Sequence, residues 1–546
     1  MNLNKPHFKL PQSPGLFSWH KNLNNQHLKL TAAAVAGAGF LYGGFAFWAG
    51  SKAEETLLEQ HQMIANMAVF TVKSHQYDRG WFSSEETTEL ELNKQLLGPY
   101  IGLLPENLRP LMNGTLRYRH HIRHGLLPGL FDLDFRPARA IVRTEFDMSD
   151  GTRKTLQRFF GDAEPITVVN RLGLTGGGEL SVTIPKFDYE ETLAGVKMNW
   201  RGFDLKVNYQ SGYKEYTVNA NTPGFAMEAG PKGRFVFDGV KYVSEVRPGA
   251  SGVKLGNSEL NVGDIKLNWN EAIPYSIKLN ELIYLVGRVR VGEFINPSGE
   301  FRPSNVSLSG LKYQIVTSEQ DDFVNTRGKL DFERFAYNDS VYGPFKLDVS
   351  ANHLHGPTLV KLDEALAKVP FQGTDPSLLR KKYLDTVIKE GLPLLQNDPK
   401  LVVNTFYLKL PAGVAQLNGS LSLKGFQQSD LKNTLLFLQR FTAQFNLELP
   451  QQTLENLVVT QARNLFTVDA SAEEQPNVEE IDALARSLLS AQLDEWAAQK
   501  LIRREGSQIA TSVLFSGGNL KINNTAVPLP WQEQEEPAPA DASAAK

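Results

Sequence analysis

The chain has 546 residues, of which 41% are hydrophobic and 21% charged, and its formal net charge at pH 7 is −3. This near-neutral charge argues against a nucleic-acid-binding protein, which would carry a basic face. Cysteine is absent, so disulfides, thiolate metal sites and cysteine nucleophiles are excluded. A chain of this length can bury a large core and divide into about one to three domains.

A basic leader and an uncharged apolar stretch begin the chain. Residues 1–29 are polar, contain four lysines and no acid, and are predicted to form a disordered cytoplasmic leader. Leu30 to Gly50 lacks any charge and has the length, about 20 residues, of a helix that crosses a bilayer. Glu54, Glu55 and Glu59 follow this stretch. Because positive charge is retained on the cytoplasmic side, the pattern predicts a single-pass transmembrane helix with the bulk of the chain outside.

Two alternatives concern this span. Ser51-Lys52-Ala53 offers small residues at the spacing of a signal-peptide cleavage site. The apolar stretch exceeds the roughly 7–15 residues of a usual signal peptide, however, which favours an uncleaved anchor. Gly39 and Gly43 form a GxxxG pair, the spacing that lets two membrane helices approach closely. A homodimer formed through the span is therefore an option, although glycine is common throughout this stretch.

The pattern after the span is helical at first and then strand-like. Residues 51–70 carry a broken apolar stripe and are predicted to form a juxtamembrane helix. Residues 71–350 are predicted to form an antiparallel, β-rich region. It begins with a hairpin whose turn is centred on Gly80.

One local pattern recurs along the β-rich region and beyond it: glycine, any residue, leucine, any residue and a large apolar residue. It starts at Gly114, Gly178, Gly328, Gly419 and Gly518. We interpret each glycine as a turn before a strand with one apolar and one polar face. The irregular spacing indicates a long antiparallel meander rather than a solenoid of fixed period.

Helical patterns return in residues 351–530, which we predict to be an α+β region. Helices are predicted at about 376–396, 451–465 and 477–504, and strands at about 401–410 and 414–424. Residues 531–546 form a tail rich in proline and alanine that cannot build a core. The predicted fold is therefore a β-rich α+β class: one N-terminal transmembrane helix, a long curved antiparallel sheet and a helix-containing C-terminal third.

Several local motifs together resemble one family, the YdgA-like proteins of Gram-negative bacteria. The similar elements are Gly50-Ser51-Lys52-Ala53-Glu54, Tyr77-Asp78-Arg79-Gly80-Trp81-Phe82-Ser83-Ser84, His124-Gly125 with Pro128, Tyr342-Gly343-Pro344-Phe345 and Gly518-Asn519-Leu520-Lys521-Ile522-Asn523. The resemblance covers about residues 30 to 530. It implies an inner-membrane anchor with a periplasmic body. It implies no reaction, because that family has no assigned function.

The densest polar cluster is Arg117 to His124. On a strand, one face would carry Arg117, Arg119, His121 and Arg123, and the other would carry His120 and His124. His120 and His124 would lie too far apart to share a zinc ion by themselves. The first face is a candidate contact for a lipid headgroup or another anion, and its alternative is an ordinary solvated sheet face. Arg79 and Ser83 in the first hairpin turn are further candidates for a lipid or partner contact. The favoured alternative is structural: Gly80 permits the turn, and Arg79 pairs with Asp78 or a neighbouring acid.

The sequence contains no motif that identifies an enzyme. There is no G-x-S-x-G elbow and no H-E-x-x-H helix, so we predict no catalytic residue, metal ligand or cofactor. The favoured function is a non-enzymatic binding or scaffold protein of the cell envelope that contacts lipid or an envelope protein. The alternative is a hydrolase of an envelope lipid or polymer.

The apolar strand faces need a cover, because large exposed apolar patches are unusual in soluble monomers. The predicted helices fall in the C-terminal third and leave few for the sheet between residues 67 and 350. That sheet either closes on itself as a sandwich or barrel, or leaves an apolar trough that holds lipid or another amphipathic partner. Self-closure is the simpler of these two expectations.

Overall fold

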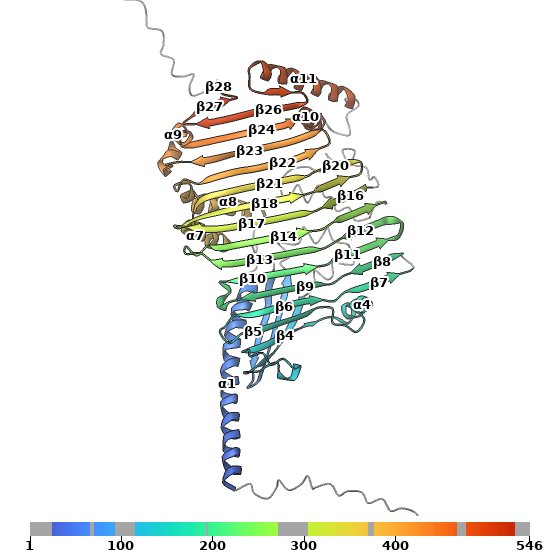
Figure 1. The fold of residues 1–546 in the computed structure, drawn as a ribbon, viewed down its shortest axis with the longest axis vertical. Coiled ribbons are helices and arrows are strands. Elements are labelled where there is room, and N and C mark those ends of the chain that lie inside the picture. The colour runs from blue at the N-terminus through green and yellow to red at the C-terminus, as the bar shows by residue number, and fades with distance from the viewer. Residues whose placement is uncertain are drawn as a thin grey trace, which may run out of the picture.

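The computed structural model describes residues 25–65, 70–92, 115–192, 195–270, 304–369, 376–466 and 477–529 (Figure 1). Helix α1 (Asn25–Ala65) joins the predicted span and most of the juxtamembrane segment into one continuous helix. Among the described residues, no helix carries an apolar stretch long enough to cross a membrane. The side chains of residues 30–39 in the predicted span lie outside the described residues, as do the leader before residue 25 and the predicted tail.

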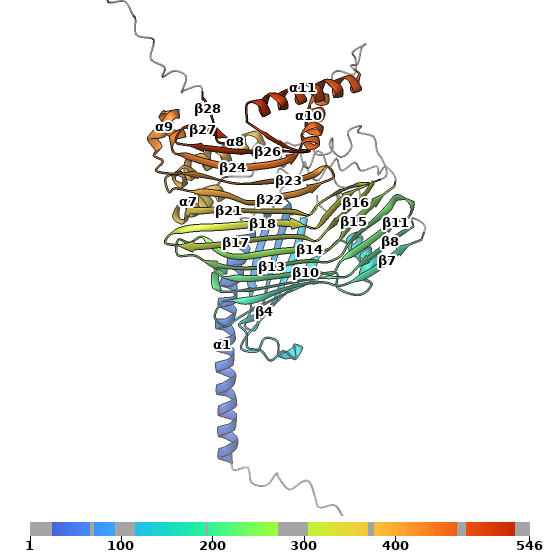
Figure 2. The same cartoon turned by 45° about the horizontal axis from the view of Figure 1, so that its top comes forward.

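A single antiparallel sheet of 20 strands forms most of the body (Figures 1 and 2). Its strands are β1 (Phe70–Arg79), β2 (Ser83–Leu92), β3 (Thr115–His124), β4 (Ala140–Asp147), β5 (Thr167–Leu172), β6 (Gly178–Ile184), β9 (Phe203–Tyr209), β10 (Tyr216–Thr222), β13 (Val240–Pro248), β14 (Lys254–Val262), β17 (Leu311–Gln320), β18 (Phe323–Phe332), β21 (Phe345–His355), β22 (Lys400–Leu410), β23 (Gly413–Leu423), β24 (Phe441–Pro450), β25 (Arg503–Glu505), β26 (Gln508–Ser516), β27 (Asn519–Ile522) and β28 (Thr525–Val527). From β1 to β24 each strand pairs with the next of this series. The predicted long antiparallel sheet and its first hairpin are confirmed.

A second sheet, of eight strands, continues from the first sheet at a bend in the strands (Figure 2). Its strands are β7 (Phe187–Glu191), β8 (Val196–Trp200), β11 (Phe225–Ala229), β12 (Gly233–Phe237), β15 (Ile265–Trp269), β16 (Ser304–Ser309), β19 (Arg334–Tyr337) and β20 (Ser340–Tyr342). Each continues a strand of the large sheet after a break of one or two residues. Glycine recurs at these breaks, and Gly224 and Gly310 have φ of 144° and 66° there. L-residues with side chains rarely adopt such angles, so glycine permits the bend.

The recurring glycines do not all start strands. Gly178 begins β6 and Gly518 precedes β27, as predicted, whereas Gly328 and Gly419 lie inside β18 and β23. A Cβ at Gly419 would lie 2.8 Å from the Cα of Phe445 on the neighbouring strand. This glycine therefore makes room across the sheet and forms no turn, which corrects the prediction. Gly114 lies outside the described residues.

The C-terminal helices largely match the prediction. The described helices after α1 are α4 (Asp150–Phe160), α7 (Gly356–Ala367), α8 (Pro376–Leu395), α9 (Thr434–Gln439), α10 (Gln451–Phe466) and α11 (Val478–Ala498), with short 3-10 turns at η1 (Leu130–Asp132), η2 (Ser211–Tyr213), η3 (Gly230–Lys232) and η4 (Gln428–Lys432). The helix predicted to reach residue 504 ends earlier, because Arg503–Glu505 pairs with β26 as strand β25. Helices α7 and α9 were not predicted, nor was α4, which Ser149 caps by accepting from the Thr152 amide.

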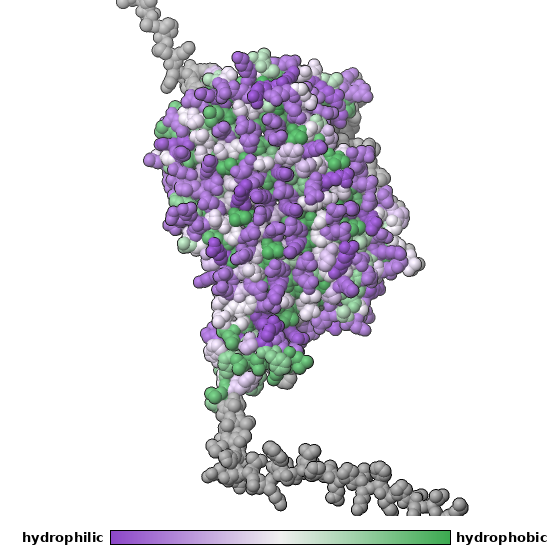
Figure 3. Space-filling model, in the orientation of Figure 1, coloured by the Kyte–Doolittle hydropathy of each residue, from purple (hydrophilic) through white to green (hydrophobic). Residues whose placement is uncertain are grey.

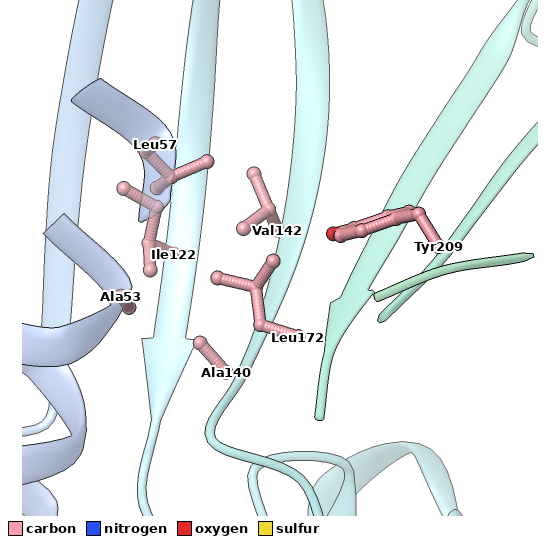
Figure 4. Close-up of a cluster of buried hydrophobic side chains, with 7 residues drawn as sticks. All are labelled: Ala53, Leu57, Ile122, Ala140, Val142, Leu172 and Tyr209. Carbon is pink, nitrogen blue, oxygen red and sulfur yellow. The ribbon is translucent and has the colours of Figure 1, made fainter. Parts of the chain in front are cut away.

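The main core lies where α1 packs on the first strands. Its buried members come from α1 and from β3, β4, β5 and β9 (Figure 4): Ala53, Leu57, Ile122, Ala140, Val142, Leu172 and Tyr209. Burying one large aliphatic side chain contributes about 1.5–3 kcal/mol. The C-terminal half of α1 is thus an integral part of the body.

The sheet face that carries α1 continues as an unbroken row of apolar residues. Twelve residues, each the register partner of the next, run from β5 to β24: Val168, Val182, Leu205, Ala220, Tyr242, Leu260, Tyr313, Leu330, Leu347, Phe406, Leu417 and Leu447. We call them the apolar ladder. None of the twelve is buried, and Tyr313 is 38% exposed. This face of the sheet is therefore apolar, but its side chains are not buried as those of a hydrophobic core are.

Candidate functional site

Two of the sequence motifs meet beneath α1 and contact it: Tyr77 to Ser84 and His124-Gly125. His124 donates from Nδ1 to the carbonyl of Ala46 on α1 (2.9 Å), and its Nε2 accepts from the Ser84 hydroxyl (3.1 Å). Burial lowers the pKa of His124, which favours this neutral form. A Cβ at Gly50 would lie 2.6 Å from the His124 ring, so glycine lets the helix approach.

Two arginines add polar contacts to the same helix. Arg79 pairs with Glu54 (3.1 Å) and lies over the Phe47 ring, 5.0 Å from its centroid. The buried Arg139 donates to the carbonyls of Lys52 (3.2 Å) and Leu174 (2.9 Å). Arg79 therefore contacts the helix. Ser83 is exposed at the start of β2, and its backbone carbonyl accepts from the Gly80 amide (3.0 Å).

Exposed apolar side chains gather around α1 at the base of the body (Figure 3). They come from α1, from the turn between β1 and β2 and from the loop after β3: Phe40, Leu41, Phe47, Trp48, Trp81, Phe82, Leu126, Leu130, Leu133 and Phe135. We call this set the apolar collar. Trp81 is 65% exposed and Leu133 81% exposed. Phe47 packs against Trp81 with ring centroids 5.3 Å apart, which connects the turn to the helix.

The four basic residues predicted on one face of β3 do share a face. All of them pair with acids of neighbouring elements: Arg117 with Asp147 (3.9 Å), Arg119 with Glu85 (3.0 Å), His121 with Glu145 (2.9 Å) and Arg123 with Asp132. These acids neutralise the positive charge of the arginines on this face. Binding of a lipid headgroup or another anion there remains a prediction.

The opposite face of β3 contributes to a cluster of three half-buried histidines and one buried glutamate. His61 comes from α1, His75 from β1, Glu86 from β2 and His120 from β3. The rings of His61 and His75 stack with centroids 3.7 Å apart. A Glu86 oxygen lies 3.6 Å from Nδ1 of His75, and the other lies 4.0 Å from Nε2 of His120.

Burial determines the protonation state of this cluster. It raises the pKa of Glu86 to about 7 and lowers that of His120 to about 4, the latter with smaller contributions from His121 and His75. It also lowers the pKa values of His75 and His61. These shifts favour the neutral imidazoles, which is the form that binds metals.

The sequence analysis missed this cluster and assigned His120 to no site. The turn at Gly80 does determine the hairpin register, in which His75 pairs with Thr88 and Tyr77 with Glu86. That register would have placed His75 and Glu86 as diagonal neighbours on one face. His61 could not have been added, because its position depends on how α1 packs on the sheet.

The Ser84–His124 pair has the spacing of a nucleophile and its base. Both side chains are buried beneath α1, however, and Nδ1 of the histidine is bonded to a backbone carbonyl. A substrate would have to displace the helix to reach the hydroxyl. We therefore assign the pair to helix docking and not to hydrolysis.

These features define a class: a β-rich protein with a long antiparallel sheet, on one end of which an N-terminal helix packs. The chain belongs to a family of bacterial proteins of unknown function (DUF945), whose model matches residues 26–530. No curated protein matches the chain.

Proposed function

We propose that this is a membrane-anchored envelope protein that binds the acyl chains of a lipid along the apolar ladder. In this proposal α1 crosses the bacterial inner membrane, residues 1–29 lie in the cytoplasm and the body lies in the periplasm. The function is non-enzymatic binding. The apolar ladder carries the proposal, because twelve consecutive register partners are apolar and none is buried.

The ladder continues the surface on which α1 packs. Val168 at its start pairs with Thr144 of β4, which pairs with His120 of β3. Two residues further along these strands, Ile122 and Val142 contact α1 on the same face. A lipid that left the bilayer beside α1 would therefore reach the ladder along one face of one sheet.

The apolar collar supports the proposed orientation. Its side chains lie beside α1 where the helix leaves the body, so they would meet the membrane surface if the helix spans the bilayer. Aromatic residues such as Trp81 and Phe82 favour that interface. Arg79 and Ser83 flank the turn that carries these two residues and would be near lipid headgroups. An exposed patch of this size on the body otherwise favours aggregation.

The test is native mass spectrometry of the full chain released from detergent micelles, followed by lipid extraction. We expect a bound phospholipid or lipid-like species that survives removal of detergent, with both acyl chains identifiable in the extract. The test variant is Leu330→Glu, which places a charge in the middle of the ladder. Its control is Lys329→Glu, which changes a residue on the opposite face of β18. Loss of the adduct in the first variant alone supports the proposal. Lipid-free wild-type protein, or equal retention in both variants, contradicts it.

A further inference from the structure

The cluster beneath α1 contains three buried polar atoms that have no hydrogen-bond partner among the described residues: Nδ1 of His61, Nε2 of His75 and Oε2 of Glu86. The three side chains can offer ligand atoms that all lie within 4.8 Å of one another. A buried polar atom without a hydrogen bond costs about 1–3 kcal/mol. Three such atoms on side chains whose possible ligand atoms lie this close together indicate a missing common partner.

We propose that His61, His75 and Glu86 bind a divalent transition-metal ion of the zinc class, and that this ion fastens α1 to the sheet. Two imidazoles and one carboxylate are a familiar ligand set for zinc, which leaves one position for water or a fourth side chain. Ligand bonds of about 2.0–2.1 Å would draw the three side chains inward by roughly an ångström. Calcium and magnesium are disfavoured, because they prefer oxygen ligands.

Hydroxyl groups orient two of the imidazoles. Nδ1 of His75 lies 3.1 Å from the Thr88 hydroxyl, which leaves Nε2 as the coordinating nitrogen. Nδ1 of His120 lies 2.9 Å from the Thr144 hydroxyl, and its Nε2 faces Glu86. Such outer-shell hydrogen bonds determine which nitrogen of a histidine binds the metal. His120 is therefore the candidate for the fourth ligand.

The ligands come from elements that meet only in the folded protein. His61 belongs to the helix proposed to cross the membrane, and the others belong to β1, β2 and β3. An ion shared by these side chains would link the helix to the sheet that carries the apolar ladder. The consequence is a metal-dependent connection between the anchor and the body, independent of whether the ladder binds lipid.

The experiment uses the full chain in detergent, purified without a polyhistidine tag and stripped with EDTA. After addition of Zn²⁺ and gel filtration, we expect about one zinc ion per chain. Zinc should also raise the thermal midpoint by several degrees, because it binds only the folded state. Co²⁺ should give the visible absorption of a tetrahedral site.

Two matched pairs of variants make the test specific. His75→Ala and Glu86→Gln should hold almost no zinc and lose the thermal shift. His121→Ala and Glu85→Gln should behave as wild type, since these residues form a histidine–glutamate pair on the opposite face of β3 and β2, 4.0 Å apart. Retention of wild-type zinc by Glu86→Gln would overturn the proposal. If Glu86→Gln does not fold, the measurements on the wild-type protein test the proposal. Wild-type protein that binds no zinc and shows no thermal shift would also overturn it.

Discussion

Replacing Gly50 by alanine is expected to loosen the docking of α1, whereas the same change at Gly44 is expected to leave it intact. A Cβ at residue 50 would lie 2.6 Å from Cε1 of His124. That ring cannot swing aside, because its two nitrogens are bonded to Ala46 and Ser84. Overpacking of this kind costs about 1–3 kcal/mol. A Cβ at Gly44 meets nothing within 4 Å, and alanine there favours the helix by roughly 0.5–1 kcal/mol.

The measurement is the free energy of unfolding of the two variants in detergent. A double-mutant cycle identifies the cause, because His124→Ala removes the ring that the new methyl group would strike. Gly50→Ala should therefore cost less in the His124→Ala background than in wild type. Equal costs in both backgrounds, or equal stability of the Gly50→Ala and Gly44→Ala variants, would show that the close contact is not what holds the helix.

A spin label at the apolar collar is expected to lie in lipid, while a label at the far end of the body is expected to lie in water. The chain has no native cysteine, so single labelling sites can be introduced without other changes. Leu133 and Leu488 suit this comparison, because both are leucines with largely exposed side chains, 81% and 63%. Leu133 follows β3 at the base of the body, and Leu488 lies on α11 at the opposite end (Figure 1).

The full chain carrying each label would be reconstituted in liposomes and its accessibility to two relaxation reagents compared. The Leu133→Cys label should be relaxed mainly by oxygen, which concentrates in the bilayer. The Leu488→Cys label should be relaxed mainly by a water-soluble nickel complex. Equal access of the nickel complex to both labels would contradict the proposed contact between the collar and the membrane.

Local patterns in the sequence were sufficient for the elements whose signals lie within a few residues. The turn at Gly80 predicted the first hairpin, and apolar periodicity predicted α8, α10 and the start of α11. The second sheet was not predicted, because its strands extend those of the first sheet after breaks of one or two residues. A break such as Pro223-Gly224 is indistinguishable by sequence from an ordinary turn.

The candidate sites could not be predicted in full from the sequence, because the residues that form them are distant from one another in the chain. The alternation along β3 correctly separated Arg117, Arg119, His121 and Arg123 from His120, yet the acids that pair with the basic residues lie on other elements. The apolar ladder likewise exists only through the register of many strands. Its members are ordinary alternating apolar residues in the sequence, and nothing local distinguishes Tyr313 from a residue of a packed core.

Site-specific photo-crosslinking in living cells tests most directly whether the apolar ladder contacts lipid. A benzophenone amino acid would replace Tyr313 on the ladder, where an aromatic ring already stands, or Val316 on the opposite face of β17. The two positions are similarly exposed, at 38% and 41%. We predict that irradiation at residue 313 gives a lipid adduct detectable by intact mass, and that residue 316 gives none. No lipid adduct at residue 313, or equal adducts at both positions, would contradict the account.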